Sequence, residues 1–272
     1  MKVNKTAGLL AVGGVNLSFF SRWRSALAGL GPVKGFRYRV ARRIVNGLHA
    51  GVAVHEYSEL SSTKWIWLFA PDDAVDALAA ELSAAISLQG KTVVILETPR
   101  SSASFAPLLP HAKLATVNVV PEFEEGLLVA EGHDAVVLEL EKLARADGRK
   151  LLAIRANRKA VYLSGVLFSS QMLLPWLTGA VTSLRSAGVG RVDAARIVQV
   201  LGAAAMRSAL HASEKAWNPG APAHEAYRVL NEWETLRSAD PRFAALFEYG
   251  SSALREFFDK DRSARARARA AG

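Results

Sequence analysis

The chain has 272 residues, a formal net charge of +9 and no cysteine. Half of its residues are hydrophobic and 22% are charged, which is typical of a folded globular protein and excludes wholesale disorder. The absence of cysteine excludes disulfides, thiolate zinc sites and cysteine nucleophiles, and a reducing cytoplasm is the expected location. The length is sufficient for two domains with an ample core.

The first predicted elements are a strand, a glycine-containing turn and a helix. The strand covers residues 7–12, the turn covers residues 13–16, and the helix begins at about Leu17. Gly31-Pro32 is expected to end the helix, and a second strand follows over residues 34–39. This arrangement is where a dinucleotide-binding fold carries its glycine fingerprint.

The rest of the chain divides into a mixed part and a helical part. Strands are predicted over 52–55, 64–70, 92–96, 113–120, 127–131 and 151–155, and helices over 74–88 and 135–146. This alternation indicates a parallel, doubly wound sheet. After it, only helices are predicted, over 159–184, 192–212, 223–237 and 241–259. The expected fold class is therefore α/β, an N-terminal doubly wound Rossmann-like sheet (residues 1–155) followed by an all-α C-terminal domain (residues 156–261).

Two segments have alternative interpretations. Residues 160–184 contain no charged residue and are long enough to span a bilayer, but their serines, threonines, Gln171 and Pro175 favour a helix buried among other helices. Residues 262–272 carry four arginines interspersed with alanine. A nucleic-acid or membrane contact is one interpretation of this tail, but it has no aromatic residue for base stacking, so a disordered basic tail is favoured. We expect neither a membrane nor a nucleic acid as a partner.

Three short motifs follow the predicted elements. Pro-Asp-Asp-Ala (71–74) comes after the fourth strand, and Lys-Ala-Val-Tyr (159–162) opens the long helix. Trp-Asn-Pro-Gly (217–220), between two later helices, is a weaker match. In this order they resemble the 6-phosphogluconate dehydrogenase-like superfamily. Within it the chain is most similar to Rossmann-like proteins of unassigned substrate near pyrroline-5-carboxylate reductase, over residues 7–258.

The resemblance implies a cofactor, a substrate site and an assembly. An NADP cofactor would lie across the carboxyl edge of the sheet, with Pro71 among its contacts. A small-molecule substrate or ligand would lie between the two domains. The helical domain would form a homodimer, often with exchanged helices.

The glycine fingerprint itself is degenerate. The pattern G-x-G-x-x-G falls on residues 13–18, Gly-Gly-Val-Asn-Leu-Ser, so only its first glycine is kept. Val15 stands where the second glycine lets the backbone approach the pyrophosphate, and this opposes binding of a dinucleotide. A helix capped by Asn16 or Ser18 can still bind one phosphate. The candidate cofactor contacts in this turn are Gly13, Gly14, Asn16 and Ser18.

Arginines without any acid follow the second strand. Arg37 and Arg39 stand where a carboxylate would hold the ribose 2′-hydroxyl of NAD, and arginine there suits the 2′-phosphate of NADP. Arg42 and Arg43 come directly after them. The functional interpretation is a 2′-phosphate clamp, and the alternative is a solvated basic face in an arginine-rich chain. We expect NADP as the cofactor if the degenerate turn still permits binding.

Candidate catalytic residues lie at the start of the long helix. Hydride transfer to a carbonyl or imine needs a proton donor, commonly Lys, His or Tyr. Lys159 matches a lysine of related 3-hydroxyacid dehydrogenases, although Leu163 stands where those enzymes have asparagine. Tyr162 lies three residues on, so the two side chains share a helix face. The alternative is a positively charged helix start with a packed tyrosine.

Three further side chains are candidates for substrate binding. Thr98 follows the fifth strand, Asn118 ends the sixth, and Gln171 lies along the long helix. The six histidines show no metal-ligand spacing, and hydrolase and kinase motifs do not occur, so no metal is expected. The sequence therefore predicts an NADP-dependent oxidoreductase of a small carbonyl or imine compound. The alternative is a non-catalytic Rossmann-like scaffold that has lost the cofactor and binds a ligand or partner.

Overall fold

The computed structural model describes most of the chain, and its contacts divide the chain into two compact units. The described residues are 6–12, 18–21, 23–120, 123, 126–211, 238, 241–242, 244–246, 248–250 and 252. Unit 1 covers Met1–Val166 and unit 2 covers Leu167–Gly272. The predicted domain limits stay a prediction.

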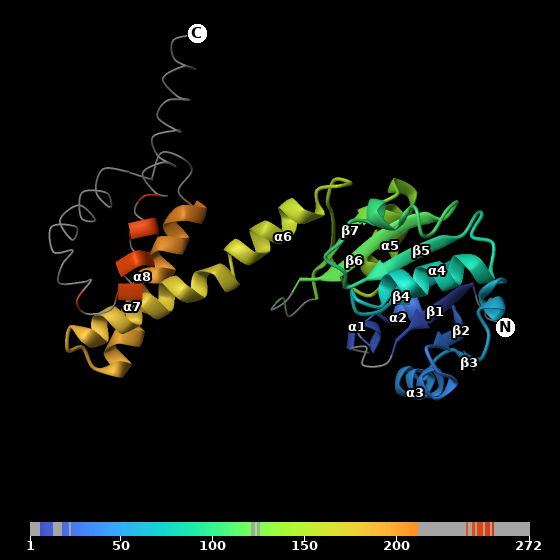
Figure 1. The fold of residues 1–272 in the computed structure, drawn as a ribbon, viewed down its shortest axis with the longest axis horizontal. Coiled ribbons are helices and arrows are strands. Elements are labelled where there is room, and N and C mark those ends of the chain that lie inside the picture. Colours follow the sequence, from blue (N-terminus) through green and yellow to red (C-terminus); the bar gives the residue numbers. More distant parts are fainter. Residues whose placement is uncertain are drawn as a thin grey trace, which may run out of the picture. The chain divides into compact units, whose positions relative to one another are not determined.

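Unit 1 is built on an eight-stranded sheet with the strand order β3-β2-β1-β4-β5-β6-β7-β8 (Figure 1). The strands are β1 (Ala7–Ala11), β2 (Leu30–Gly35), β3 (Val52–Val54), β4 (Trp65–Phe69), β5 (Thr92–Leu96), β6 (Lys113–Val119), β7 (Leu128–Gly132) and β8 (Leu151–Ala153). The first six strands pair in parallel. The order reverses between β1 and β4, and in open α/β sheets ligands bind outside the carboxyl ends of the strands at such a point.

Helices cover both faces of this sheet. One hydrophobic cluster joins it to α1 (Ser18–Ser21), α2 (Arg24–Leu27), α3 (Tyr38–Leu48) and α5 (Asp134–Ala146). The other joins it to α4 (Val75–Ala85) and the 3-10 helices η1 (Tyr57–Leu60) and η2 (Ser102–Phe105). Side chains alternate between the faces because a strand has a period of two, so Leu9 and Leu10 enter opposite clusters. The predicted fold class, a doubly wound sheet followed by helices, is confirmed.

One strand pair corrects the expectation of a parallel sheet. β7 runs antiparallel to β6, with Thr116 opposite Glu131, and β8 then runs parallel to β7. β6 ends at Val119 and β7 begins at Leu128, a connection too short for the crossover of about a dozen residues that parallel neighbours need.

The limits of the second strand also differ from the prediction. Two short helices, α1 and α2, lie where one long helix was predicted, and β2 already begins at Leu30. Gly31 and Pro32 lie inside β2, where Pro32 is paired with Val52, so ladder pairing overrides the turn signal of this dipeptide. The strand ends at Gly35, and Arg37 takes the N-cap position of α3. The predicted clamp residues therefore still follow the carboxyl end of β2.

The helical part of the chain begins with α6 (Lys159–Phe168), followed by η3 (Gln171–Leu173), α7 (Leu174–Ser186) and α8 (Arg191–His211). The predicted helix over 159–184 is thus interrupted at Ser169-Ser170. Its predicted burial is not found within one chain, where most side chains of α6 and α7 are exposed. Lys159–Ser186 is long and apolar enough to cross a membrane, but one such stretch, with a mean hydropathy of 1.3, is weak evidence. The predicted helix over 223–237, Trp217–Gly220 and the tail lie outside the described residues.

Candidate functional site

A group of polar side chains gathers at the carboxyl ends of β4, β5 and β6. Asp72 follows β4, Thr98 follows β5, Asn118 lies near the end of β6, and Lys159 opens α6. Thr98 donates a hydrogen bond from Oγ1 to Asp72 Oδ1 at 3.0 Å, and Asn118 Nδ2 donates to the Thr98 carbonyl at 3.1 Å. The predicted residues Thr98, Asn118 and Lys159 therefore all lie at one edge of the sheet in unit 1.

Lys159 is the buried charge of this group. Only 2% of the residue is exposed, and its Nζ donates to the Thr116 hydroxyl at 2.7 Å. Desolvation lowers the pKa of Lys159 to about 8, against the carboxylates of Glu131, Glu97 and Asp72, which raise it. An amine with this pKa can both donate and accept a proton near neutral pH, which is what a general acid–base group requires.

Asn118 presents an acceptor without a partner. While its Nδ2 is held by the Thr98 carbonyl, its buried Oδ1 has no hydrogen-bond partner within the described residues. A buried acceptor left unpaired costs about 1–3 kcal/mol. A ligand N–H that reached this oxygen would recover that cost, which fits the predicted role of Asn118 in binding.

Glu97 and Tyr162 complete the edge. Glu97 has a left-handed backbone with φ of 55°, and its Oε1 accepts the Val119 N–H at 2.8 Å. Although much of this residue is exposed, its carboxyl packs on the end of β6, and the resulting desolvation raises its pKa. Tyr162 is half-buried, and desolvation together with the charge of Glu97 raises the pKa of its phenol.

Thr116 and Glu131 are not among the residues predicted from the sequence. Both lie inside strands, where a polar residue is easily taken for the solvent-facing half of an alternating pattern. The available signal was Glu131 itself, a carboxylate in the otherwise apolar sequence Leu-Val-Ala-Glu-Gly. Glu97 is likewise not among the residues predicted from the sequence.

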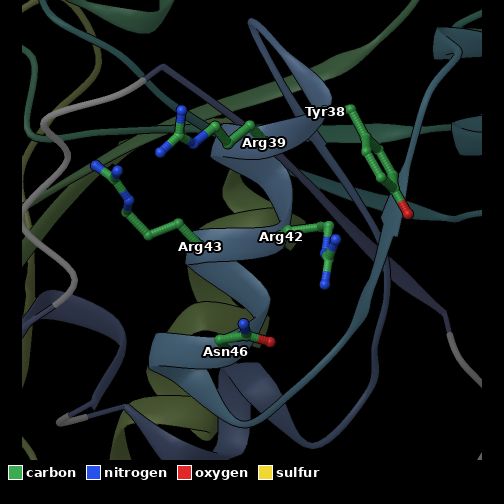
Figure 2. Close-up of a pocket in the computed structure, with 5 residues that line it drawn as sticks. All are labelled: Tyr38, Arg39, Arg42, Arg43 and Asn46. Carbon is green, nitrogen blue, oxygen red and sulfur yellow. The ribbon is translucent and has the colours of Figure 1, made fainter.

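A second candidate region is a hollow of about 480 Å³ beside α3. It is lined by Tyr38, Arg39, Arg42, Arg43 and Asn46. Figure 2 shows Arg39 and Arg43 extending to the same side of the helix, as residues four apart do, while Arg42 extends to the other. α3 contains no acidic residue, so the hollow suits an anion. The ring of Tyr38 stacks on His55 with centroids 3.7 Å apart, which fixes one wall.

The remaining predicted residues lie elsewhere or outside the described part. Gly13, Gly14 and Asn16 are outside it, and Ser18 is described only as the first residue of α1. Pro71 is exposed, and its carbonyl accepts N–H groups at the start of α4. Gln171 lies in unit 2, exposed, in η3. No group of three or more metal-ligating side chains occurs among the described residues.

No protein-family model matches the chain, and no curated protein matches it either. Solved structures do. An imine reductase from Myxococcus stipitatus in complex with NADP+ is 15% identical and gives a TM-score of 0.66 over 93% of this chain and 94% of its own. The chain has the fold of that reductase.

Two further structures share this reductase fold. The V8 variant of the Myxococcus stipitatus enzyme in complex with NAD+ is 14% identical, with a TM-score of 0.70 over 96% of this chain and 95% of its own. A reductive aminase from Aspergillus terreus, in complex with NADPH4, cyclohexanone and allyl amine, is 14% identical. Its TM-score is 0.59 over 94% of each chain.

Proposed function

We propose that the chain is an NADP-dependent oxidoreductase that transfers a hydride to or from a small carbonyl or imine compound. The observation that carries this proposal is the buried Lys159 at the carboxyl edge of the sheet, with Thr98 and Asn118 beside it. The shared fold supports it, since solved structures with this fold are complexes of reductases with NADP+ or NAD+.

The residues after β2 fit the adenosine end of NADP. Arg37, Arg39 and Arg43 would hold the 2′-phosphate, because one guanidinium group can donate two parallel hydrogen bonds to a phosphate. α3 contains no carboxylate that would compete for these arginines. Gly13, Gly14, Asn16, Ser18 and Pro71 are the proposed contacts along the rest of the cofactor. When bound, the cofactor supplies or accepts the hydride.

The side chains at the carboxyl edge would then donate or accept the proton of the reaction. In reduction, the Lys159 ammonium donates a proton to the carbonyl oxygen or imine nitrogen of the substrate, and in oxidation its amine takes the proton back. Asn118 Oδ1 accepts a hydrogen bond from the substrate, and Thr98 holds Asn118 in place. We assign Tyr162 to the same site, on the next turn of α6, and Gln171 to substrate binding.

Direct titration with cofactor tests this proposal. Trp23 and Trp67 are buried in contact, with ring centroids 5.4 Å apart, and Trp23 closely follows α1, so we expect tryptophan fluorescence to change when NADPH binds. Val15→Gly restores the second glycine of the fingerprint and is expected to tighten binding. If the fluorescence of both the unaltered protein and Val15→Gly stays constant up to millimolar NADPH and NADH, the proposal is contradicted. It would favour the non-catalytic scaffold, the second candidate, for which Val15 is the evidence.

We also propose that two copies of the chain associate through the helical unit. Many large apolar side chains of this unit are exposed, among them Phe168, Leu174, Val192, Val200, Leu201 and Leu210. Monomeric soluble proteins rarely expose an apolar surface of this kind without a partner. Light scattering after size exclusion is expected to give the mass of two chains, and Leu201→Glu should shift it towards one chain. The mass of one chain for the unaltered protein would exclude the dimer.

A further inference from the structure

Glu131 is a buried carboxylate that the proposed reaction does not yet use. Only 1% of the residue is exposed. Its Oε1 accepts the Ser102 N–H at 2.5 Å and the Thr116 hydroxyl at 2.9 Å, and its Oε2 accepts the Ser102 hydroxyl at 3.1 Å. The Thr116 oxygen is also the acceptor for Lys159. Three side chains from β7, β6 and α6 thus form one continuous chain of hydrogen bonds.

The direction of these hydrogen bonds follows from the chemistry of the groups. An ionised carboxylate only accepts, so the single hydroxyl proton of Thr116 is committed to Glu131. The lone pairs of the Thr116 oxygen are then left for the Lys159 N–H. Glu131 therefore determines which way Thr116 points and, through it, where the Lys159 amine is held.

A purely structural role explains Glu131 poorly. Burying an ionised carboxylate costs several kcal/mol of solvation free energy, and no other residue of β7 carries a polar side chain. Within the described residues Glu131 makes no direct ion pair, and its nearest cation in the network is Lys159, one hydroxyl away. Costly buried charges of this kind concentrate at functional sites.

We propose that Glu131 is a positioning residue that acts through Thr116, fixing the Lys159 amine at the carboxyl edge and keeping it protonated by its negative charge. Its kinetic consequence rests on the proposed function, but its effect on Lys159 does not. Two other carboxylates influence Lys159: Glu97 after β5 and Asp72 after β4. Among the carboxylates that raise the pKa of Lys159, Glu131 has the largest effect.

The ionisation of Lys159 can be measured without turnover. In protein labelled with 13C-lysine, the Cε and Hε shifts of Lys159 report its titration, and their loss in Lys159→Arg assigns them. We expect Glu131→Gln to lower the midpoint by about one pH unit, since it removes an opposite charge close to the amine. Thr116→Val should lower it as well, and Thr116→Ser should restore it. Glu139→Gln, the same chemical change on the exposed face of α5, is the control and should leave it unchanged.

The outcomes separate this inference from the proposed function. A Lys159 midpoint that is the same in Glu131→Gln, Thr116→Val and the unaltered protein would overturn the role of Glu131. Should Glu131→Gln not fold, the Thr116→Val and Thr116→Ser pair decides alone. In kinetics, Glu131→Gln should shift the pH limb of kcat by the same amount while KM for NADPH stays constant. If no carbonyl or imine is turned over, the proposed function fails, and the midpoint still decides on Glu131.

Discussion

Lys159→Met is expected to lower kcat for carbonyl or imine reduction by about 10²–10⁴-fold, the usual contribution of a positioned acid or base. NADPH binding should be unaffected, because in this proposal the residue meets the substrate and not the adenosine end of the cofactor. Methionine keeps the volume of the side chain while removing the proton. Lys142→Met, at an exposed lysine of α5, is the control and should keep full activity.

The same residue gives the reaction a pH dependence with a defined sign. The pKa of Lys159 is lowered to about 8 by desolvation, so the ammonium is the main form below pH 8 and the neutral amine above it. Reduction consumes a proton, and its rate should fall as the pH rises through about 8, while oxidation should become faster. In Lys159→Arg the guanidinium stays protonated, so this change of rate near pH 8 should disappear. A limb near pH 8 that persists in Lys159→Arg would assign the titration to another group.

Replacement of Arg39 and Arg43 together by alanine is expected to raise the dissociation constant for NADPH by about 100-fold or more. Each charge-assisted hydrogen bond to a phosphate contributes about 1.5–3 kcal/mol, and about 1.4 kcal/mol corresponds to tenfold. The constant for NADH should change little, since NADH lacks the 2′-phosphate. Fluorescence titration with both cofactors measures this difference.

Three single variants identify which side of α3 matters. Arg42 extends to the other side from Arg39 and Arg43 (Figure 2), so Arg42→Ala should weaken NADPH binding less than either Arg39→Ala or Arg43→Ala. Arg145→Ala removes an exposed arginine from α5, where it pairs with Glu141, and should have no effect. An equal loss of NADPH and NADH binding in the double variant would contradict the 2′-phosphate clamp.

The sheet was predictable from the sequence because its strands are short apolar runs between clear breaks. β5 lies where the pattern of residues 92–96 predicts it. The direction of β7 was not read from these patterns, since a strand has the same alternation in either direction. The helix over 160–184 was expected to be buried among other helices because its serines, threonines, Gln171 and Pro175 disfavour a bilayer. Composition does not say what covers a surface, and within one chain most of these side chains are exposed.

The residues of the candidate site were predictable where they directly follow or end a predicted strand. They were not predictable where their place depends on which strands pair and in which direction. Thr98 and Asn118 follow or end parallel strands whose carboxyl ends meet, so topology alone brings them near each other. Lys159 follows β8, which runs opposite to these strands, and its side chain reaches the site through Thr116. Glu131 reaches Lys159 only because its strand is opposite Thr116 in an antiparallel ladder. Arg43 was named with the arginines after the second strand but was not selected, because β2 and α3 were predicted with the wrong limits.

The pairing of Thr116 with Glu131 makes proton chemistry depend on strand register. Leu128 and Ala130 enter the cluster that contains α5, and Glu131 faces away from that cluster. A shift of β7 by one residue would turn Glu131 into the apolar layer and leave an aliphatic side chain opposite Thr116. Insertions inside β7 should therefore be selected against more strongly than insertions in the connection before it. A chain with β7 shifted in this way would bury its core less well. It would also lose the contact between Glu131 and Thr116, through which Lys159, the proposed acid, is held.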